Sequence, residues 1–402
     1  MTLHPNACSL LWKHVALGTH PHGPIVTPCC RFFLGEIERI KYNILQPAHT
    51  AIKDENYIKL LQQKMQNGEK LPECIKCWTE EAAGKESMRQ HFNNQFANTV
   101  NVEKFELEYL EIVFSNLCNL ACRMCTISDS SSWANLYNKT FYVDKIRDEH
   151  VVPIESIDAN GKAKTKVISM NQYDFTEIDL SKLTLIKILG GEPMMSVEHV
   201  GFLKELEKVH PNLESLEIVY HTNVTKRPPL EVIEIWKKIG VINIIFSIDG
   251  YGEVNDYART FSDWKTIEEN VEWYYSLKLL YNINLQFGIH TVLNVLTAWH
   301  FDKLRNWITN DKNIDNFKEI SIDFVRYPKY LNLAYMPADL KDLYIEKIKS
   351  INLSKKQKDR LINHMASEAS DNEVWKEFLI KMKSLDKFTK KDLTKIIPLE
   401  SY

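Results

Sequence analysis

Residues 105–125 read FELEYLEIVFSNLCNLACRMC, and this stretch decides the fold. Its first half is an apolar β-type run that predicts a strand over Leu110–Phe114. Its second half places Cys118, Cys122 and Cys125 on one loop, at gaps of three and two residues. A structural zinc site needs four protein ligands, whereas three thiolates suit an iron–sulfur cluster with one iron left open. The other interpretation is a buried apolar loop whose cysteines lie close by chance.

Outward from this stretch, apolar β-type runs alternate with helical patterns. Further strands are predicted over five ranges: Thr184–Leu189, Ser215–Tyr220, Ile242–Ile248, Asn284–Leu293 and Glu319–Val325. Most of the intervening segments have apolar residues spaced three and four apart, which predicts helices. This alternation favours right-handed βαβ units and a parallel sheet. The sequence therefore predicts an α/β fold, a (β/α)6 partial TIM barrel with functional loops at the carboxyl ends of its strands.

The chain divides into three predicted parts. Residues 1–100 form a small Cys-rich domain, residues 101–330 the barrel, and residues 331–402 a helical C-terminal extension with solvated Lys-rich faces. A polar segment at about 127–180 interrupts the barrel and predicts a hairpin or a lid.

Composition limits the class of protein. The chain has 402 residues and a net charge of −3, so dedicated nucleic-acid binding is disfavoured. No apolar run reaches the roughly 20 residues of a membrane span, and the N-terminus does not resemble a secretion signal. We therefore expect a cytoplasmic protein, whose eight cysteines are not disulfides. All eight lie at or before residue 125, a distribution that scattered core cysteines would not give.

The C-x3-C-x2-C loop after the first barrel strand resembles the signature of the radical S-adenosylmethionine (SAM) superfamily. That signature usually has an aromatic residue before the last cysteine, where this chain has Met124. The resemblance implies that Cys118, Cys122 and Cys125 bind a [4Fe–4S] cluster whose open iron is chelated by SAM. It also implies reductive cleavage of SAM to a 5′-deoxyadenosyl radical that abstracts a substrate hydrogen. A cofactor is needed because protein side chains cannot do this chemistry.

Further motifs follow in the family's order. Gly190-Gly191-Glu192-Pro193 resembles the turn that holds the SAM amino group, with Glu192 as the acceptor. The resemblance also implies SAM contacts at strand ends, by Thr222, Asn223, Ser247, Arg259 and Leu293. Arg259 would pair with the SAM carboxylate. Asp249 is expected to cap a turn. Local packing and a surface ion pair are the other interpretation of Ser247 and Arg259.

The N-terminal cysteines resemble a SPASM/twitch module, although that module usually follows the barrel. The resemblance implies a second, auxiliary [4Fe–4S] cluster, with ligands drawn from Cys8, Cys29, Cys30, Cys74 and Cys77. We favour Cys29 over Cys30, but sequence does not separate them. A zinc ribbon is the alternative, and His14 or His22 could replace one thiolate.

The sequence therefore predicts a radical SAM enzyme that modifies a peptide or protein, with a reductant such as flavodoxin or ferredoxin. The alternatives are a small-molecule substrate, an RNA substrate, or a zinc-binding scaffold with a degenerate barrel. Asp323, Arg326 and Tyr327 lie near the end of the sixth strand and could face the substrate. Surface pairing explains them equally well, and no catalytic acid, base or radical donor is singled out.

Overall fold

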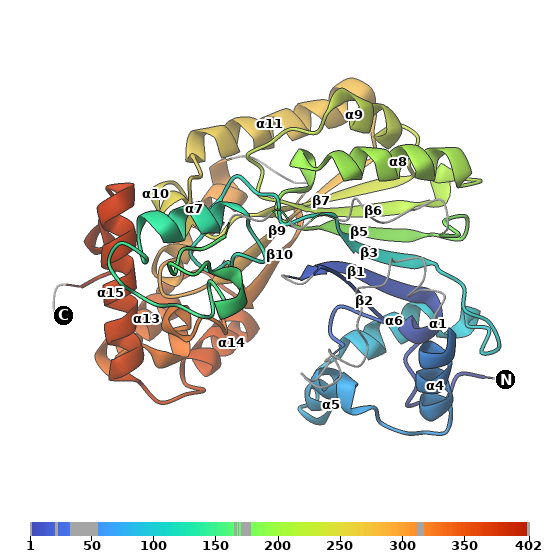
Figure 1. Cartoon of the computed structure of the whole chain (residues 1–402), viewed down its shortest axis with the longest axis horizontal. Coiled ribbons are helices and arrows are strands. Elements are labelled where there is room, and N and C mark those ends of the chain that lie inside the picture. Colours follow the sequence, from blue (N-terminus) through green and yellow to red (C-terminus); the bar gives the residue numbers. More distant parts are fainter. Residues whose placement is uncertain are drawn as a thin grey trace.

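The centre of the protein is an eight-stranded sheet in the order β10-β9-β7-β6-β5-β3-β1-β2 (Figure 1). The computed structural model describes residues 2–20, 23–32, 55–164, 167, 169, 178–311 and 317–399. The strands of the sheet are β1 (His14–His20), β2 (Gly23–Thr27), β3 (Tyr109–Val113), β5 (Leu185–Leu189), β6 (Glu217–Thr222), β7 (Val241–Ser247), β9 (Leu285–Leu293) and β10 (Phe317–Phe324). A second sheet pairs two short strands, β4 (Ala121–Cys122) and β8 (Arg259–Thr260).

The six predicted barrel strands are confirmed as β3, β5, β6, β7, β9 and β10, with ends that shift by no more than two residues. Each pairs in parallel with its neighbour in the sheet. The predicted α/β fold with a mainly parallel sheet of the partial-barrel type is therefore confirmed. Parallel order brings the carboxyl ends of these strands to one edge, where functional loops gather.

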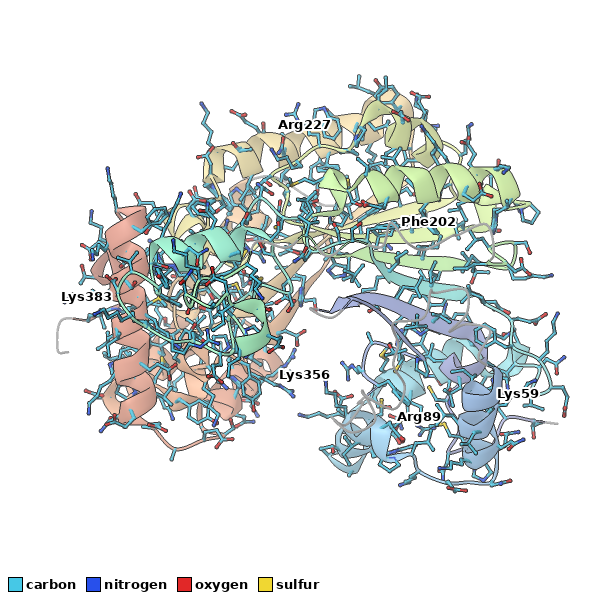
Figure 2. The ribbon with its side chains drawn as sticks, in the orientation of Figure 1. Lys59, Arg89, Phe202, Arg227, Lys356 and Lys383 are labelled. Atoms are coloured by element: carbon cyan, nitrogen blue, oxygen red, sulfur yellow. The ribbon has the colours of Figure 1, made fainter. Side chains whose placement is uncertain are left out.

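Helices α8 (Val197–Val209), α9 (Leu230–Trp236) and α11 (Trp264–Tyr281) cover one face of the sheet (Figure 1). Alternate strand residues such as Ile186 and Ile188 are fully buried. Phe202 of α8, labelled in Figure 2, packs against Phe114 with ring centroids 5.6 Å apart. We call the opposite face the inner face of the sheet.

The N-terminal cysteine-rich segment shares the barrel's sheet. Strand β1 pairs in parallel with β3, and β2 pairs antiparallel with β1, so this hairpin extends the sheet at one edge. Its helices are α1 (Leu10–Lys13), α4 (Glu55–Gln66), α5 (Ile75–Ala82) and α6 (Met88–Phe96). Their apolar core contains Trp12, Met65 and also Tyr109 of β3, so the segment packs directly on the first barrel strand.

The C-terminal extension is helical, as expected, with α13 (Ala338–Ser350), α14 (Lys355–Met365) and α15 (Asn372–Thr389). Helices α13 and α14 and the N-terminal helices lie on the side of the sheet opposite α8, α9 and α11, and α15 stands beside the end of the sheet (Figure 1). Short helices α10 (Glu253–Ala258) and α12 (Phe301–Asn306) complete the barrel. No helix among the described residues is both long and apolar enough to cross a membrane.

The polar segment after the cysteine loop forms α7 (Ser132–Lys139), a 3-10 helix at Ile154–Ser156 and an isolated bridge between Ile157 and Ala163. Its predicted hairpin or lid falls partly on residues 165–166, 168 and 170–177, which lie outside the described residues. The described part therefore contains a helix that packs against the cysteine loop, followed by a short antiparallel turn between Ile157 and Ala163.

Candidate functional site

The three cysteines of the C-x3-C-x2-C loop lie together after the carboxyl end of β3. Cys118 and Cys122 are buried around Leu120, and Cys125 packs against them partly exposed. The N–H of Cys125 donates to the carbonyl oxygen of Cys122 at 2.9 Å, and the N–H of Leu120 lies 3.4 Å from the Cys118 sulfur. The loop therefore turns tightly enough to keep all three sulfurs on one side of the chain.

The start of α7 holds the carbonyl groups of this loop. The Ser132 hydroxyl donates to the carbonyl of Cys118 at 2.7 Å, and the Trp133 indole N–H donates to that of Cys122 at 2.9 Å. The Ser130 hydroxyl donates to the carbonyl of Leu120. Sequence reasoning missed this support. The run of serines at 130–132 could have indicated it, because serines are favoured at helix N-termini and form hydrogen bonds with nearby backbone groups.

Arg259 is placed beside the cysteine loop by the small second sheet. Cys122 of β4 and Arg259 of β8 are register partners, and the Arg259 Nη1 atom lies 3.9 Å from the Cys122 sulfur. Its Nε atom lies 2.8 Å from Oδ2 of Asp249, which is fully buried. The other oxygen of Asp249 accepts the N–H of Val292 at 2.8 Å. Asp249, expected only to cap a turn, is thus the buried counter-ion of Arg259.

Burial and the neighbouring charges set the ionisation of these groups. Burial raises the pKa of Cys118 to about 12. A hydrogen bond from the Cys125 thiol lowers the pKa of Cys122 against the effect of burial, and the charge of Arg259 acts in the same direction. The first cause of the shift is the partner thiol, so the Cys122 and Cys125 sulfurs lie within hydrogen-bonding reach of each other.

The Gly190–Pro193 turn packs directly on the segment that leads into the cysteines. The N–H of Gly191 donates to the carbonyl of Ser115 at 2.9 Å, and the N–H of Glu192 donates to that of Leu117 at 2.8 Å. Gly190 has a φ of +137°, a conformation that side chains rarely adopt. Pro193 begins the 3-10 helix Pro193–Met195 that leads into α8. The predicted turn is thus a direct neighbour of the cysteine loop.

Glu192 joins the carboxyl ends of β5 and β6. Its Oε1 accepts from Thr222 Oγ1 at 2.9 Å and its Oε2 accepts from the N–H of Asn223 at 2.7 Å. The side-chain amide of Asn223 lies 3.6 Å from the Cys118 sulfur. Burial raises the pKa of Glu192 to about 7. Three of the predicted site residues therefore form one buried network that reaches the cysteines.

Two predicted residues lie apart from that network. Ser247 is the last residue of β7, half-buried and in register with His290 of β9. Leu293 ends β9, and its side chain belongs to the continuous hydrophobic core. Both lie at the carboxyl edge of the sheet.

The N-terminal cysteines separate into a group of four and a single residue. Cys8 is close enough to Cys29, Cys74 and Cys77 for their charges to interact, and burial raises the pKa of Cys8 to about 12. Cys30 is exposed; its sulfur lies 4.0 Å from the Met88 sulfur. Glu111 of β3 helps to raise the pKa of Cys30 to about 11, after burial as the main cause.

Arg89 of α6 holds the cysteine-bearing segments together (Figure 2). It forms a salt bridge with Glu81 of α5 at 2.8 Å and donates to the carbonyls of Pro5 and Ala7 at 2.8 and 3.1 Å. It thereby links the helix of Cys77 to the residue before Cys8.

The sequence left His14 and His22 as possible replacements for one thiolate ligand, and the structure describes only His14. His14 Nδ1 lies 2.8 Å from the carbonyl oxygen of Pro28, and the His14 ring packs against Tyr109 at a tilt of 40°. His22 lies outside the described residues. Among the described residues, no three His, Cys, Asp or Glu side chains are arranged around a single metal ion. In a [4Fe–4S] cluster each cysteine binds a different iron, so its ligands are not required to meet at one point.

The inner face of the sheet carries a row of charged side chains that sequence reasoning largely missed. Glu111 of β3 and Lys187 of β5 are register partners 3.6 Å apart. Farther along, Asp323 of β10 lies 3.3 Å from His290 and 3.3 Å from Arg360 of α14. For Asp323, the sequence left a substrate-facing role and surface pairing as equal interpretations, and the structure shows these ion pairs. The neighbouring Arg326 and Tyr327 are exposed. The sequence does contain a signal for this charged face. Along each strand these charged residues alternate with apolar ones, and alternate side chains point to opposite faces of a sheet.

Comparison with known proteins agrees with this site. Residues 112–308, from β3 to the turn after α12, match the model of the Radical SAM superfamily. The chain is similar to native anSMEcpe with bound AdoMet, at 20% identity over 66% of this chain and 64% of that one, with a TM-score of 0.37. It is also similar to Streptococcus suis SuiB bound to S-adenosylmethionine, at 15% identity over 85% and 67%, with a TM-score of 0.34.

A further SuiB structure, bound to precursor peptide SuiA, matches at 15% identity over 87% of this chain and 71% of that one, with a TM-score of 0.34. The chain thus spans just under two thirds of the anSMEcpe chain. No curated protein matches. The signature cysteines, the GGEP turn and Arg259 all fall within the segment that the family model matches. The match to the Radical SAM superfamily model thus covers residues 112–308, a little under half of the chain.

Proposed function

We propose that this protein is a radical SAM enzyme. The observation that carries the proposal is the meeting of three sequence-distant elements at the carboxyl edge of the sheet. These are the loop of Cys118, Cys122 and Cys125, the Gly190–Pro193 turn bonded to it, and Arg259 beside Cys122. Structural support alone would not require a buried carboxylate and a buried guanidinium beside three thiols, because burying the two charged groups is costly.

The cysteine loop fits a [4Fe–4S] cluster with one open iron. Its donors are three thiols that lie together on a tight loop, and the Arg259 guanidinium beside Cys122 would favour the thiolate form that binds iron. When bound, the cluster supplies the electron that cleaves SAM to methionine and a 5′-deoxyadenosyl radical. A reductant such as flavodoxin or ferredoxin would restore that electron. The chain's own part is to hold the sulfurs through Ser130, Ser132 and Trp133.

The residues around the loop suit the polar groups of SAM. Glu192 Oε2 accepts one hydrogen bond and has capacity for a second, so it can receive an ammonium group. An ammonium there would also stabilise the carboxylate form, which burial disfavours. Arg259 would attract the SAM carboxylate while Asp249 holds its orientation. Thr222, Asn223, Ser247 and Leu293 would line the ribose and adenine side.

We propose Cys8, Cys29, Cys74 and Cys77 as ligands of an auxiliary [4Fe–4S] cluster in a twitch-like module. The support is their mutual proximity and the link that Arg89 makes between their segments. Cys30 is proposed as the surplus thiol, because it is exposed and its thiol interacts with Glu111 on the inner face, with Cys29 as its one neighbour among the four. A zinc ion on the same four thiols is the competing assignment, and metal analysis separates the two.

The proposed substrate is a peptide or protein segment bound along the inner face. That face offers charges of both signs, from Glu111 and Lys187 at one end to Asp323 and Arg360 at the other. Such a surface suits the alternating donors, acceptors and mixed charges of a polypeptide. It is less suited to the uniform negative charge of RNA, which Glu111 and Asp323 would repel.

The first test is anaerobic iron and sulfide quantitation after reconstitution, on wild type and on the Cys118→Ala/Cys122→Ala/Cys125→Ala variant. Two clusters predict about eight irons per chain in wild type and about four in the variant. Dithionite-reduced wild type should also convert SAM to 5′-deoxyadenosine, and the variant should not. Absence of both iron and SAM cleavage in wild type would overturn the enzyme assignment. Zinc in place of half the iron would remove only the auxiliary cluster.

A further inference from the structure

Arg123 lies inside the cysteine signature, yet its side chain points away from the sulfurs. The side chain is completely buried, and its Nη2 atom lies 2.8 Å from Oδ1 of Asp386 in α15. Nη1 lies 3.1 Å from the sulfur of Met382, one turn earlier in the same helix. The guanidinium also lies 3.6 Å from the ring centroid of Tyr257. The back of the cysteine loop is therefore packed on the C-terminal helix.

Asp386 also binds the end of α10, the helix that leads directly into β8. Its Oδ2 accepts the hydroxyl of Tyr257 at 2.9 Å and the N–H of Leu393 at 2.9 Å. Tyr257 is two residues before Arg259, and the intervening Ala258 carbonyl accepts the N–H of Arg123 at 2.8 Å. One carboxylate of α15 thus connects the two short strands that place Cys122 and Arg259 side by side.

This connection is needed because the strands themselves are very short. Strands β4 and β8 have two residues each, too few to fix their separation by pairing alone. The Asp386 carboxylate is mostly buried, and each of its oxygens is bonded to at least one donor. Neutralising it would leave the Arg123 charge buried without its counter-ion, which is strongly unfavourable.

We infer that Asp386 is a positioning residue for the SAM–cluster site. Its bonds to Arg123 and Tyr257, on the side of the loop away from the sulfurs, keep Arg259 beside Cys122. This inference rests on the proposed function for its link to SAM. It makes α15 part of the site, although the helix lies outside the matched segment 112–308. The effect passes through Arg123 and Tyr257, and Asp386 itself touches neither the sulfurs nor the expected SAM position.

The test compares Asp386→Asn with Asp148→Asn, a matched control. Asp148 is also a buried carboxylate paired with α15, through Lys381 at 2.6 Å, but it binds neither β4 nor β8. The first readout needs no cofactor. In apo-protein, iodoacetamide should alkylate Cys122 about tenfold faster in Asp386→Asn than in wild type, since local opening exposes the thiol. Asp148→Asn should stay close to wild type.

The second readout uses reconstituted protein. In Asp386→Asn we expect SAM to bind about tenfold more weakly, and to give a smaller change in the electron paramagnetic resonance spectrum of the reduced cluster, with normal iron content. If Asp386→Asn does not fold, Tyr257→Phe removes the hydrogen bond between α10, just before β8, and Asp386, and smaller changes in the same direction are expected. Equal alkylation rates in Asp386→Asn and wild type, or equal effects of both aspartate variants, would overturn the inference. If wild type binds no cluster, only the proposed function fails, because the alkylation result stands by itself.

Discussion

Gly191 lies so close to the carbonyl oxygen of Leu117 that a Cβ atom built on it would be only 2.4 Å from that oxygen. A Cβ on Gly190 would lie 2.9 Å from the carbonyl oxygen of Ser115. Both obstacles are backbone atoms of the segment that leads into Cys118. The glycines of the GGEP turn are therefore required by contact with the cysteine loop, whatever ligand the turn also holds.

Gly191→Ala should displace the cysteine loop, because the new methyl group overlaps backbone atoms that cannot rotate away. We expect a loss of roughly 1–3 kcal/mol in the free energy of unfolding, as in overpacked cores, and lower iron incorporation. The control is Gly201→Ala in α8, where a Cβ meets nothing within 4 Å. That change should stabilise by up to about 1 kcal/mol through helix propensity. Equal stability and iron content in the two variants would contradict the steric argument.

His199 of α8 makes the stability of the barrel depend on pH. Its Nε2 lies 2.9 Å from the Tyr220 hydroxyl, and burial lowers the pKa of His199 to about 3. The unfolded chain binds the proton near pH 6.5, so this contribution is complete above that pH and is lost as the pH falls toward 3. The loss attributable to His199 at pH 5 is roughly 2 kcal/mol.

His199→Gln should therefore flatten the decline in stability between pH 8 and pH 5, measured by urea unfolding at each pH. The prediction concerns only the difference in stability between the two pH values, because the amide of the variant also replaces a well-packed ring at both. His150→Gln, at an exposed position, is the control and should keep the wild-type dependence. An unchanged pH dependence in His199→Gln would assign the acid sensitivity to other groups.

The barrel strands could be predicted because each is a short apolar run bounded by polar residues, and the cysteine loop because its ligands are close in sequence. The supports of the site could not. Asp386 meets Arg123 from 263 positions away, and nothing local marks either as a partner. Asp249 next to Gly250 has the sequence of an ordinary turn, and only the fold brings Arg259 and the N–H of Val292 to it. Likewise, β1 joins β3 through pairing that spans the whole N-terminal segment.

Substitutions in the buried ion pair of Arg259 and Asp249 should affect protein stability and SAM binding differently. Arg259→Met leaves Asp249 charged and buried, which we expect to cost roughly 3–5 kcal/mol in the free energy of unfolding. Adding Asp249→Asn should recover most of that loss, because the neutral amide needs no counter-charge and its oxygen still accepts the N–H of Val292.

SAM binding should not recover with stability. In the double variant Arg259→Met/Asp249→Asn, the reduced cluster should form but show no spectral change on addition of SAM, since the guanidinium beside Cys122 is gone. Thermal unfolding and titration with SAM measure the two properties on the same samples. Wild-type SAM affinity in the double variant would show that Arg259 has only a structural role.

Cys29 and Cys30 are adjacent in sequence but should differ completely in metal binding. The Cys29 thiol is close to Cys8 and Cys74, whereas Cys30 is exposed and faces Glu111. Cys29→Ser should therefore lower the iron content from about eight to about four per chain, and Cys30→Ser should leave it at about eight. Each variant replaces one thiol by a hydroxyl at adjacent positions. Each therefore controls for a general effect of losing a cysteine from this turn. The reverse result would place Cys30 among the ligands and require the Pro28–Cys30 turn to rotate on cluster binding, with Cys29 left facing the protein core.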